Sequence, residues 1–139
     1  MNAMRFLDTN VLLYAISQTP AEAGKTARAL ALLDADDWAL SVQVVQEFYV
    51  QATRASKADR IPHDQAVALI EAWLRFRVQE LTIPILLAAL RTKARYQLSY
   101  WDAAIIEAAR AAGCRELYSE DLNAGQDYEG VRVVNPFAV

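Results

Sequence analysis

Residues 4–16, MRFLDTNVLLYAI, are the stretch that decides the fold class. Met4 to Leu7 form a short, mostly apolar run, typical of a buried strand, and this run ends at Asp8. Val11 to Ile16 follow without a loop and are too long and unbroken to form a second strand. The segment therefore predicts a strand followed directly by a helix, with Asp8 at the joint.

Short apolar strands and amphipathic helices alternate along the rest of the chain. The further strands are expected at Trp38–Leu40, Val78–Leu81, Leu117–Tyr118 and Val131–Val134. Several intervening helices are nearly all apolar, which favours a parallel sheet covered on both faces. The predicted fold class is α/β: one three-layer domain, residues 1–139, with a central, mostly parallel sheet of about five short strands between helices.

Helical spacing also predicts which side chains face the core. Leu86, Leu87, Leu90 and Ala94 are expected to form the buried face of a fifth helix. Trp101 is expected to pack inward from a sixth helix, because it shares a stripe with Ala104, Ile105, Ala108, Ala109 and Ala112.

Composition bounds the class of protein. The 139 residues are 55% hydrophobic and 22% charged, with 4 Gly and 4 Pro, which excludes disordered and collagen-like chains. The net charge of −3 means that a nucleic-acid partner has to be held by a local basic patch or through bound cations. Met4 is as good a start as Met1, so residues 1–3 are interpreted as an expression remnant.

The expected location is the cytoplasm. The single cysteine, Cys114, cannot form an internal disulfide, which fits a reducing compartment. No apolar run approaches the roughly 20 residues that span a bilayer, and the N-terminus lacks the pattern of a signal peptide.

Four acids stand where a ligand crevice is expected, because ligands of open parallel sheets bind at the carboxyl ends of the strands. These acids are Asp8, Glu47, Asp102 and Asp121. Each also has a structural explanation: Asp8 as a helix N-cap, Asp102 in a capping box with Ser99, Asp121 in a turn, and Glu47 as a solvated side chain.

Two observations favour a shared site over these separate roles. Asp102 and Glu47 lie beside apolar helix positions, where a carboxylate needs a partner. No Lys, Arg or His lies within two positions of Asp8 or Asp102. A metal ion would supply the missing charge, and oxygen-only ligands favour Mg²⁺ or Mn²⁺ over zinc or copper.

Several motifs resemble those of a known family. They are FLDTN at 6–10, QEF at 46–48, SYWDAAI at 99–105, SED at 119–121 and NPF at 135–137. In this order and spacing they resemble the PIN-domain ribonucleases, and within these the VapC toxins of bacterial toxin–antitoxin pairs. The resemblance extends over essentially the whole chain.

The resemblance implies a Mg²⁺- or Mn²⁺-dependent endoribonuclease that cuts single-stranded RNA and acts as a toxin. It also implies a small antitoxin that blocks the site and a homodimer that carries two such sites. The family's metal-binding and catalytic acids match Asp8, Glu47, Asp102 and Asp121, and its supporting polar positions match Asn10 and Ser119. At the fourth acid, Glu120 is an alternative to its neighbour Asp121.

The chemistry of the residues agrees with this hypothesis. Cations held by carboxylates activate water and stabilise phosphoryl charge without a protein base. The only histidine, His63, follows Pro62 at an expected helix start, which does not favour a two-histidine ribonuclease. No serine stands in a nucleophile elbow.

Candidate RNA contacts are Arg54, Lys57 and Arg60, which cluster after the Glu47 helix, with an ordinary solvated face as the equally weighted alternative. A base could also stack on Trp101, although its helical period favours core packing.

Two other functions remain as alternatives. An aspartate-nucleophile phosphatase also places Asp after a strand, but it needs a second acid where Asn10 stands. A non-catalytic, receiver-like interaction domain needs an acidic pair at the first strand end and a Lys at the last.

Overall fold

The structure, a computed structural model, describes residues 5–138. The interpreted remnant at residues 1–3 and the first predicted strand residue, Met4, lie outside this range. The elements in chain order are β1 (Arg5–Leu7), α1 (Thr9–Ala15), η1 (Pro20–Glu22), α2 (Ala23–Leu33), β2 (Trp38–Ser41), α3 (Val42–Thr53), α4 (His63–Trp73), β3 (Arg77–Gln79), α5 (Ile83–Tyr96), α6 (Tyr100–Ala111), β4 (Glu116–Tyr118), β5 (Asp127–Tyr128) and β6 (Val131–Val134).

The strands form one sheet in the order β3-β2-β1-β4-β6-β5, parallel throughout except for β5. The predicted α/β class and mostly parallel sheet are thereby confirmed. The sheet has six strands, one more than expected, because β5 is a two-residue antiparallel edge strand. A segment this short carries no alternating pattern.

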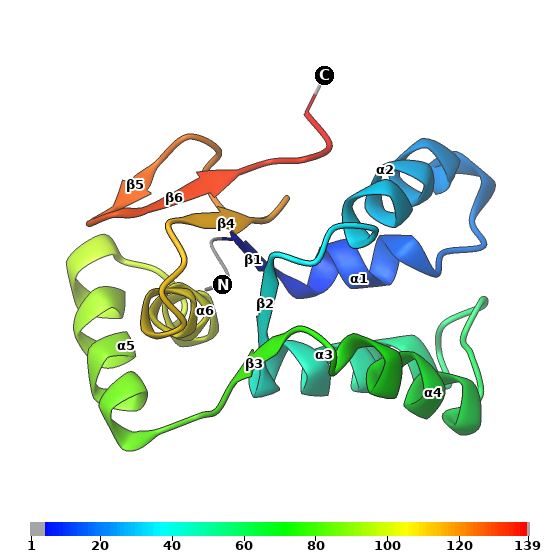
Figure 1. Ribbon diagram of the computed structural model, residues 1–139, viewed down its shortest axis with the longest axis horizontal. Coiled ribbons are helices and arrows are strands. Elements are labelled where there is room, and N and C mark those ends of the chain that lie inside the picture. The colour runs from blue at the N-terminus through cyan, green and yellow to red at the C-terminus, as the bar shows by residue number, and fades with distance from the viewer. Residues whose placement is uncertain (1–4, 139) are drawn as a thin grey trace.

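Helices cover both faces of the sheet, as Figure 1 shows: α5 and α6 lie on one side, and α1 to α4 on the other. The small, apolar side chains of α6 let it pack closely, and residues 103–109 are all buried. Among the described residues, no helix combines the length and apolarity needed to cross a membrane.

The central strand positions the crevice. β1 pairs with β2 on one side and β4 on the other, so the chain leaves β1 at a topological switch point. The main-chain N–H of Asp8 donates to the Tyr118 carbonyl at 3.0 Å, which continues the β1–β4 pairing to the strand ends. Residues that follow β1 and β4 therefore lie side by side.

Two predictions of buried side chains are wrong. On α5, all four residues of the expected face, Leu86, Leu87, Leu90 and Ala94, are exposed, whereas Ile85 and Ala89 face inward. Trp101 is 64% exposed although the rest of its stripe is buried. Helical periodicity identifies an apolar face, but it does not say whether the chain's own core covers that face.

Candidate active site

Asp8 is the most buried of the four acids. Its Oδ1 accepts from the Thr9 N–H at 2.7 Å, so it does cap α1, and its Oδ2 accepts from the Ser119 hydroxyl at 2.8 Å. Burial raises the pKa of Asp8, the two hydrogen bonds lower it, and the charges of Asp121 and Glu47 raise it again, which leaves a pKa of about 6. A residue that only caps a helix does not need other acids such as Asp121 and Glu47 near it.

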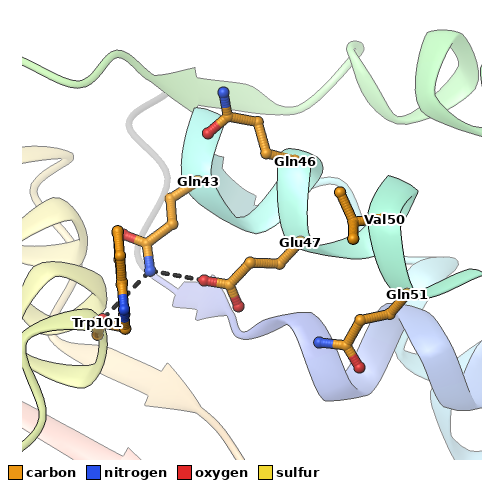
Figure 2. Close-up of a pocket in the computed structure, with 6 residues that line it drawn as sticks. All are labelled: Gln43, Gln46, Glu47, Val50, Gln51 and Trp101. Carbon is orange, nitrogen blue, oxygen red and sulfur yellow. Dashed lines mark hydrogen bonds between the residues drawn. The ribbon is translucent and has the colours of Figure 1, made fainter. Parts of the chain in front are cut away.

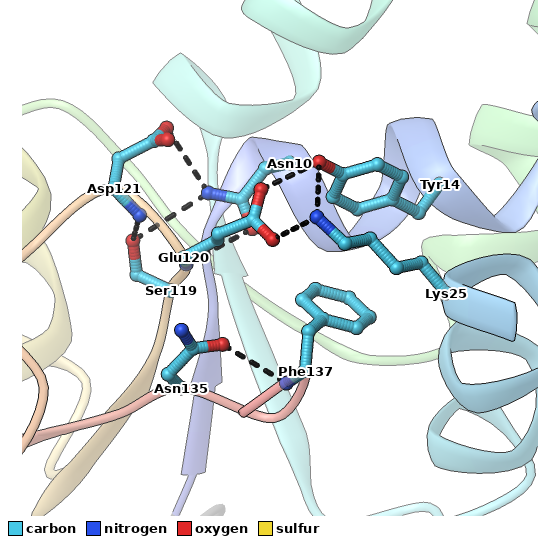
Figure 3. Close-up of polar contacts among 8 residues, drawn as sticks. All are labelled: Asn10, Tyr14, Lys25, Ser119, Glu120, Asp121, Asn135 and Phe137. Atoms are coloured by element: carbon cyan, nitrogen blue, oxygen red, sulfur yellow. Dashed lines mark hydrogen bonds and ion pairs between the residues drawn. The ribbon is translucent and has the colours of Figure 1, made fainter. Parts of the chain in front are cut away.

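Ser119 and Asn10 connect Asp8 to the last acid. Ser119 is fully buried after β4, and its hydroxyl accepts from the Asp121 N–H at 3.1 Å. The Asn10 amide donates to Asp121 Oδ2 at 3.1 Å, and its carbonyl accepts from the Glu120 N–H at 3.3 Å (Figure 3). The loop after β4 is therefore attached to the first turn of α1.

Glu47 reaches the same crevice from α3. Its Oε2 accepts from the Thr9 hydroxyl at 3.2 Å, and its Oε1 accepts from the Gln43 amide at 2.7 Å. The side chain is half-buried rather than freely solvated. Thr9 thus binds both acids: its hydroxyl donates to Glu47 and its main-chain N–H donates to Asp8.

Asp102 approaches from the first turn of α6, where Ser99 is the N-cap and accepts from the Asp102 N–H at 3.1 Å. Burial raises the pKa of Asp102, and the charge of Asp121 raises it further, whereas the Ser99 hydroxyl opposes both. The Asp102 carboxylate therefore lies within range of the Asp121 charge.

Glu120 points to a different neighbourhood. Its carboxylate accepts from the Tyr14 hydroxyl and forms an ion pair with Lys25, while the Tyr14 ring packs on Phe137 (Figure 3). Burial raises the pKa of Glu120, but the Lys25 ammonium and the Tyr14 hydroxyl outweigh it, and the net direction is down. Glu120 is thus paired with Lys25 and Tyr14, whereas the charge of Asp121 acts on Asp8.

If the chain has the metal-dependent RNA cleavage that its resemblance implies, Asp121→Asn should lower that cleavage by at least about tenfold, a typical cost of disturbing a metal site. Glu120→Gln is expected to retain most of the activity, because its partners are Lys25 and Tyr14. Initial cleavage rates of the two variants at equal Mn²⁺ concentration are the measurement. The reverse order of activities would assign the fourth position to Glu120.

Charge interactions link the four acids, Asp8 with Asp121 and Glu47, and Asp102 with Asp121, but as placed the acids do not form a metal cage. In residues 5–138, no group of three or more His, Cys, Asp or Glu side chains is arranged to hold one ion. Thr9, Asn10 and Ser119 instead hold individual carboxylates through the hydrogen bonds described above.

The predicted basic residues divide between two environments. Arg54 and Lys57 line a polar groove of about 390 Å³ that begins at Asn10 and Tyr14 beside the acids. Arg60 does not line it, and its guanidinium donates to the Ala55 carbonyl at 3.3 Å.

Sequence reasoning did not single out Thr9, Gln43, Tyr14 or Lys25. Two of them carry a local signal: Thr9 follows Asp8 directly, and Gln43 lies one helical turn before Glu47 and hence on its face. Tyr14 and Lys25 have none, because their partner Glu120 is about a hundred residues away.

Comparisons with solved structures find the same fold in proteins of toxin–antitoxin pairs. A toxin–antitoxin complex from Klebsiella pneumoniae is 21% identical with a TM-score of 0.70, over 97% of this chain and 99% of that chain. The Mycobacterium tuberculosis toxin VapC20, described as cleaving the sarcin-ricin loop, is 22% identical with a TM-score of 0.66, over 84% and 89%. DNA-bound VapBC from Salmonella typhimurium is 18% identical with a TM-score of 0.65, over 96% and 97%.

The family comparison is more direct. No curated protein matches the chain by sequence, and the structural likenesses, all below 25% identity, show the fold alone. Residues 5–126 match the PIN domain, which covers β1 and all four acids. The chain therefore belongs to the PIN domain family.

Proposed function

We propose that this protein is a divalent-metal-dependent endoribonuclease that hydrolyses single-stranded RNA as the toxin of a toxin–antitoxin pair. The observation that carries the proposal is the buried carboxylate of Asp8 at the switch point of the sheet, with a pKa raised by burial and by two neighbouring acids. Several negative charges close to a buried carboxylate are unfavourable unless a cation neutralises them. Membership of the PIN family and the sarcin-ricin-loop activity of VapC20 support the choice of RNA.

The donor set fits Mg²⁺ or Mn²⁺. All four proposed ligands, Asp8, Glu47, Asp102 and Asp121, are carboxylates, and hard cations prefer such oxygen ligands. Such a cation supplies an activated water and stabilises charge on the phosphoryl oxygens.

The chain's own polar residues then have positioning roles. Ser119 holds Asp8 Oδ2, Thr9 holds Glu47, and Asn10 holds Asp121, so each fixes the direction in which a carboxylate faces the crevice. Orientation of ligands by such neighbours typically controls metal affinity.

The RNA backbone is proposed to follow the groove that starts at Asn10. Arg54 and Lys57 line this groove and supply positive charge for phosphate groups, with Arg60 at the same loop. Glu22 and Asp59 also line it, so the two cations must select phosphate locally rather than through a broad positive field.

Two protein partners are proposed. The likeness to toxins in complex with antitoxins supports an antitoxin that covers the acidic crevice. A second copy of the chain is proposed to cover the apolar face of α5, whose exposed side chains at helical spacing are Ile83, Leu86, Leu87 and Leu90. The cytoplasm is the proposed location, where RNA is present and the buried Cys114 thiol stays reduced.

Purified protein, freed of any antitoxin, is expected to cleave single-stranded RNA with Mg²⁺ or Mn²⁺ and to stop in EDTA, because charge in the crevice requires the cation. Gel analysis of end-labelled RNA is the measurement, and added Mn²⁺ should restore the lost activity. Asp64→Asn, at an exposed acid on α4, is the control that should cut normally. Undiminished cleavage in EDTA would exclude the metal mechanism.

A further inference from the structure

The Trp101 side chain is exposed, but a neighbouring aromatic ring packs against it. It stands in the first turn of α6, 64% exposed, and the Tyr100 ring packs edge-on against it at 5.1 Å. Tyr100 in turn packs on the buried alanines of α5 and α6. The two other tryptophans, Trp38 and Trp73, are buried. An indole braced in this way and turned to solvent needs an explanation other than core packing.

The indole forms one wall of a groove that adjoins the acids. This groove, of about 440 Å³, runs between Trp101 and α3, and Glu47 lies on its opposite wall (Figure 2). The Gln43 amide joins the two walls, since it donates to Glu47 Oε1 at 2.7 Å and to the Trp101 carbonyl at 3.3 Å. Of the four acids Glu47 lines this groove, so a molecule that reaches Glu47 can extend along it toward Trp101.

The chemistry of the groove selects the kind of occupant. The remaining lining residues are Val50 and two amides, Gln46 and Gln51, with no Lys, Arg or His. Such a surface does not attract a phosphate. It suits a flat, uncharged group that stacks on an aromatic face and exchanges hydrogen bonds at its edge, and a nucleobase is such a group.

A second groove adjoins the first. Arg54 and Lys57 lie there, and Gln51 lines both grooves. The two grooves thus meet at Gln51 and differ in chemistry. One has two cations and two acids in its lining, and the other has an aromatic ring and amides.

We infer that Trp101 and the α3 amides form a nucleobase subsite, in which a base next to the cleaved phosphodiester stacks on the indole and its edge faces Gln46 and Gln51. This inference rests on the proposed ribonuclease function. It assigns a role in substrate binding to a side chain that holds no metal and carries no charge.

Trp101→Ala is expected to raise the KM for single-stranded RNA by about five- to a hundredfold, the usual cost of losing one stacked base, with a smaller change in kcat. Trp101→Phe keeps an aromatic face and should retain most of the affinity. Leu30→Ala, which truncates an exposed apolar side chain of α2 outside the groove, is the matched control and should leave KM unchanged.

RNA with a single abasic site can identify the base that stacks on Trp101. With one base removed at successive positions, the wild type should lose affinity at one position, and Trp101→Ala should lose nothing further there. Replacing Arg54 and Lys57 together by Ala should flatten the salt dependence of binding, whereas Trp101→Ala should not, because stacking releases no counterions.

A binding measurement without cleavage separates this inference from the proposed function. In EDTA, RNA should quench tryptophan emission in the wild type and in Leu30→Ala but not in Trp101→Ala, because the other tryptophans are buried. A wild type that cuts no RNA with Mn²⁺ contradicts the ribonuclease, and absent quenching or an unchanged KM in Trp101→Ala contradicts the subsite. A Trp101→Ala protein that sediments at half the wild-type mass would also overturn it, since the ring would then lie between copies.

Discussion

Asp8→Asn is expected to abolish RNA cleavage and, in EDTA, to raise the melting temperature. The activity is lost because the carboxylate at the centre of the crevice is removed, while Asn remains a good helix N-cap for α1. The protein gains stability because the pKa of Asp8, about 6, lies above its ordinary value of 3.8, so that the ionised group opposes folding at neutral pH. The shift corresponds to about 3 kcal/mol, and to a melting temperature increase on the order of 10 °C.

The pH dependence of the stability shows the direction of the Asp8 contribution. Between about pH 4 and pH 6 the folded wild type binds the Asp8 proton more strongly than the unfolded chain does, so this group's contribution is full at low pH and is lost as the pH rises through 6. The stability difference between Asp8→Asn and wild type should therefore be near zero at pH 4 and reach its full size at pH 7. Thermal melts in EDTA across this range are the measurement.

Ser119→Ala serves as a companion variant. It removes a hydrogen bond that stabilises the ionised Asp8 carboxylate, so the pKa of Asp8 should rise further. An Asp8→Asn protein that melts lower than wild type at pH 7 and cuts RNA normally would reduce Asp8 to a structural cap.

Mg²⁺ or Mn²⁺ is expected to raise the melting temperature of the wild type by several degrees, without any RNA present. A cation that binds only the folded state contributes about 2.7 kcal/mol at 100 times its Kd. Asp102→Asn should melt higher than wild type in EDTA, because the pKa of Asp102 is raised by burial and by Asp121, and it should gain less from metal. Calorimetry or a dye-based melt at matched ionic strength measures both effects.

Asp64→Asn is a matched control for this experiment. Both Asp64 and Asp102 lie in the first turn of a helix, where a negative charge normally contributes about 0.3–1 kcal/mol. Asp64→Asn should therefore melt slightly lower and keep the full metal response. An Asp102→Asn protein that behaved in the same way would show that Asp102 is an ordinary helix-end charge.

Local patterns predicted the parts of this fold that depend on neighbouring residues. The apolar run before Asp8 and the unbroken apolar run after it predicted β1 and α1, and Ser41, a typical N-cap residue, caps α3. Gly113 follows α6 with a φ of +81°, the left-handed conformation that favours glycine at a helix end. In each case the pattern and its cause lie within a few residues.

Properties that depend on distant partners could not be predicted in this way. Asn10 and Asp121 meet only because β1 and β4 pair. The Lys25 side chain, which forms an ion pair with Glu120, comes from α2. Trp101 shows the limit of periodicity, since its spacing matches a buried stripe while the first turn of α6 turns it outward. The family resemblance placed the acids, but it did not say which of Glu120 and Asp121 faces the crevice.

The pairing of β1 with β4 also has a consequence for biosynthesis. Asp8 is translated early, but its partner Ser119 is more than a hundred residues later in the chain. On the ribosome, the crevice cannot assemble before the loop after β4 has been made and released to pair with β1. The crevice is therefore incomplete for most of synthesis, and any activity that depends on it begins only when the loop after β4 reaches Asp8.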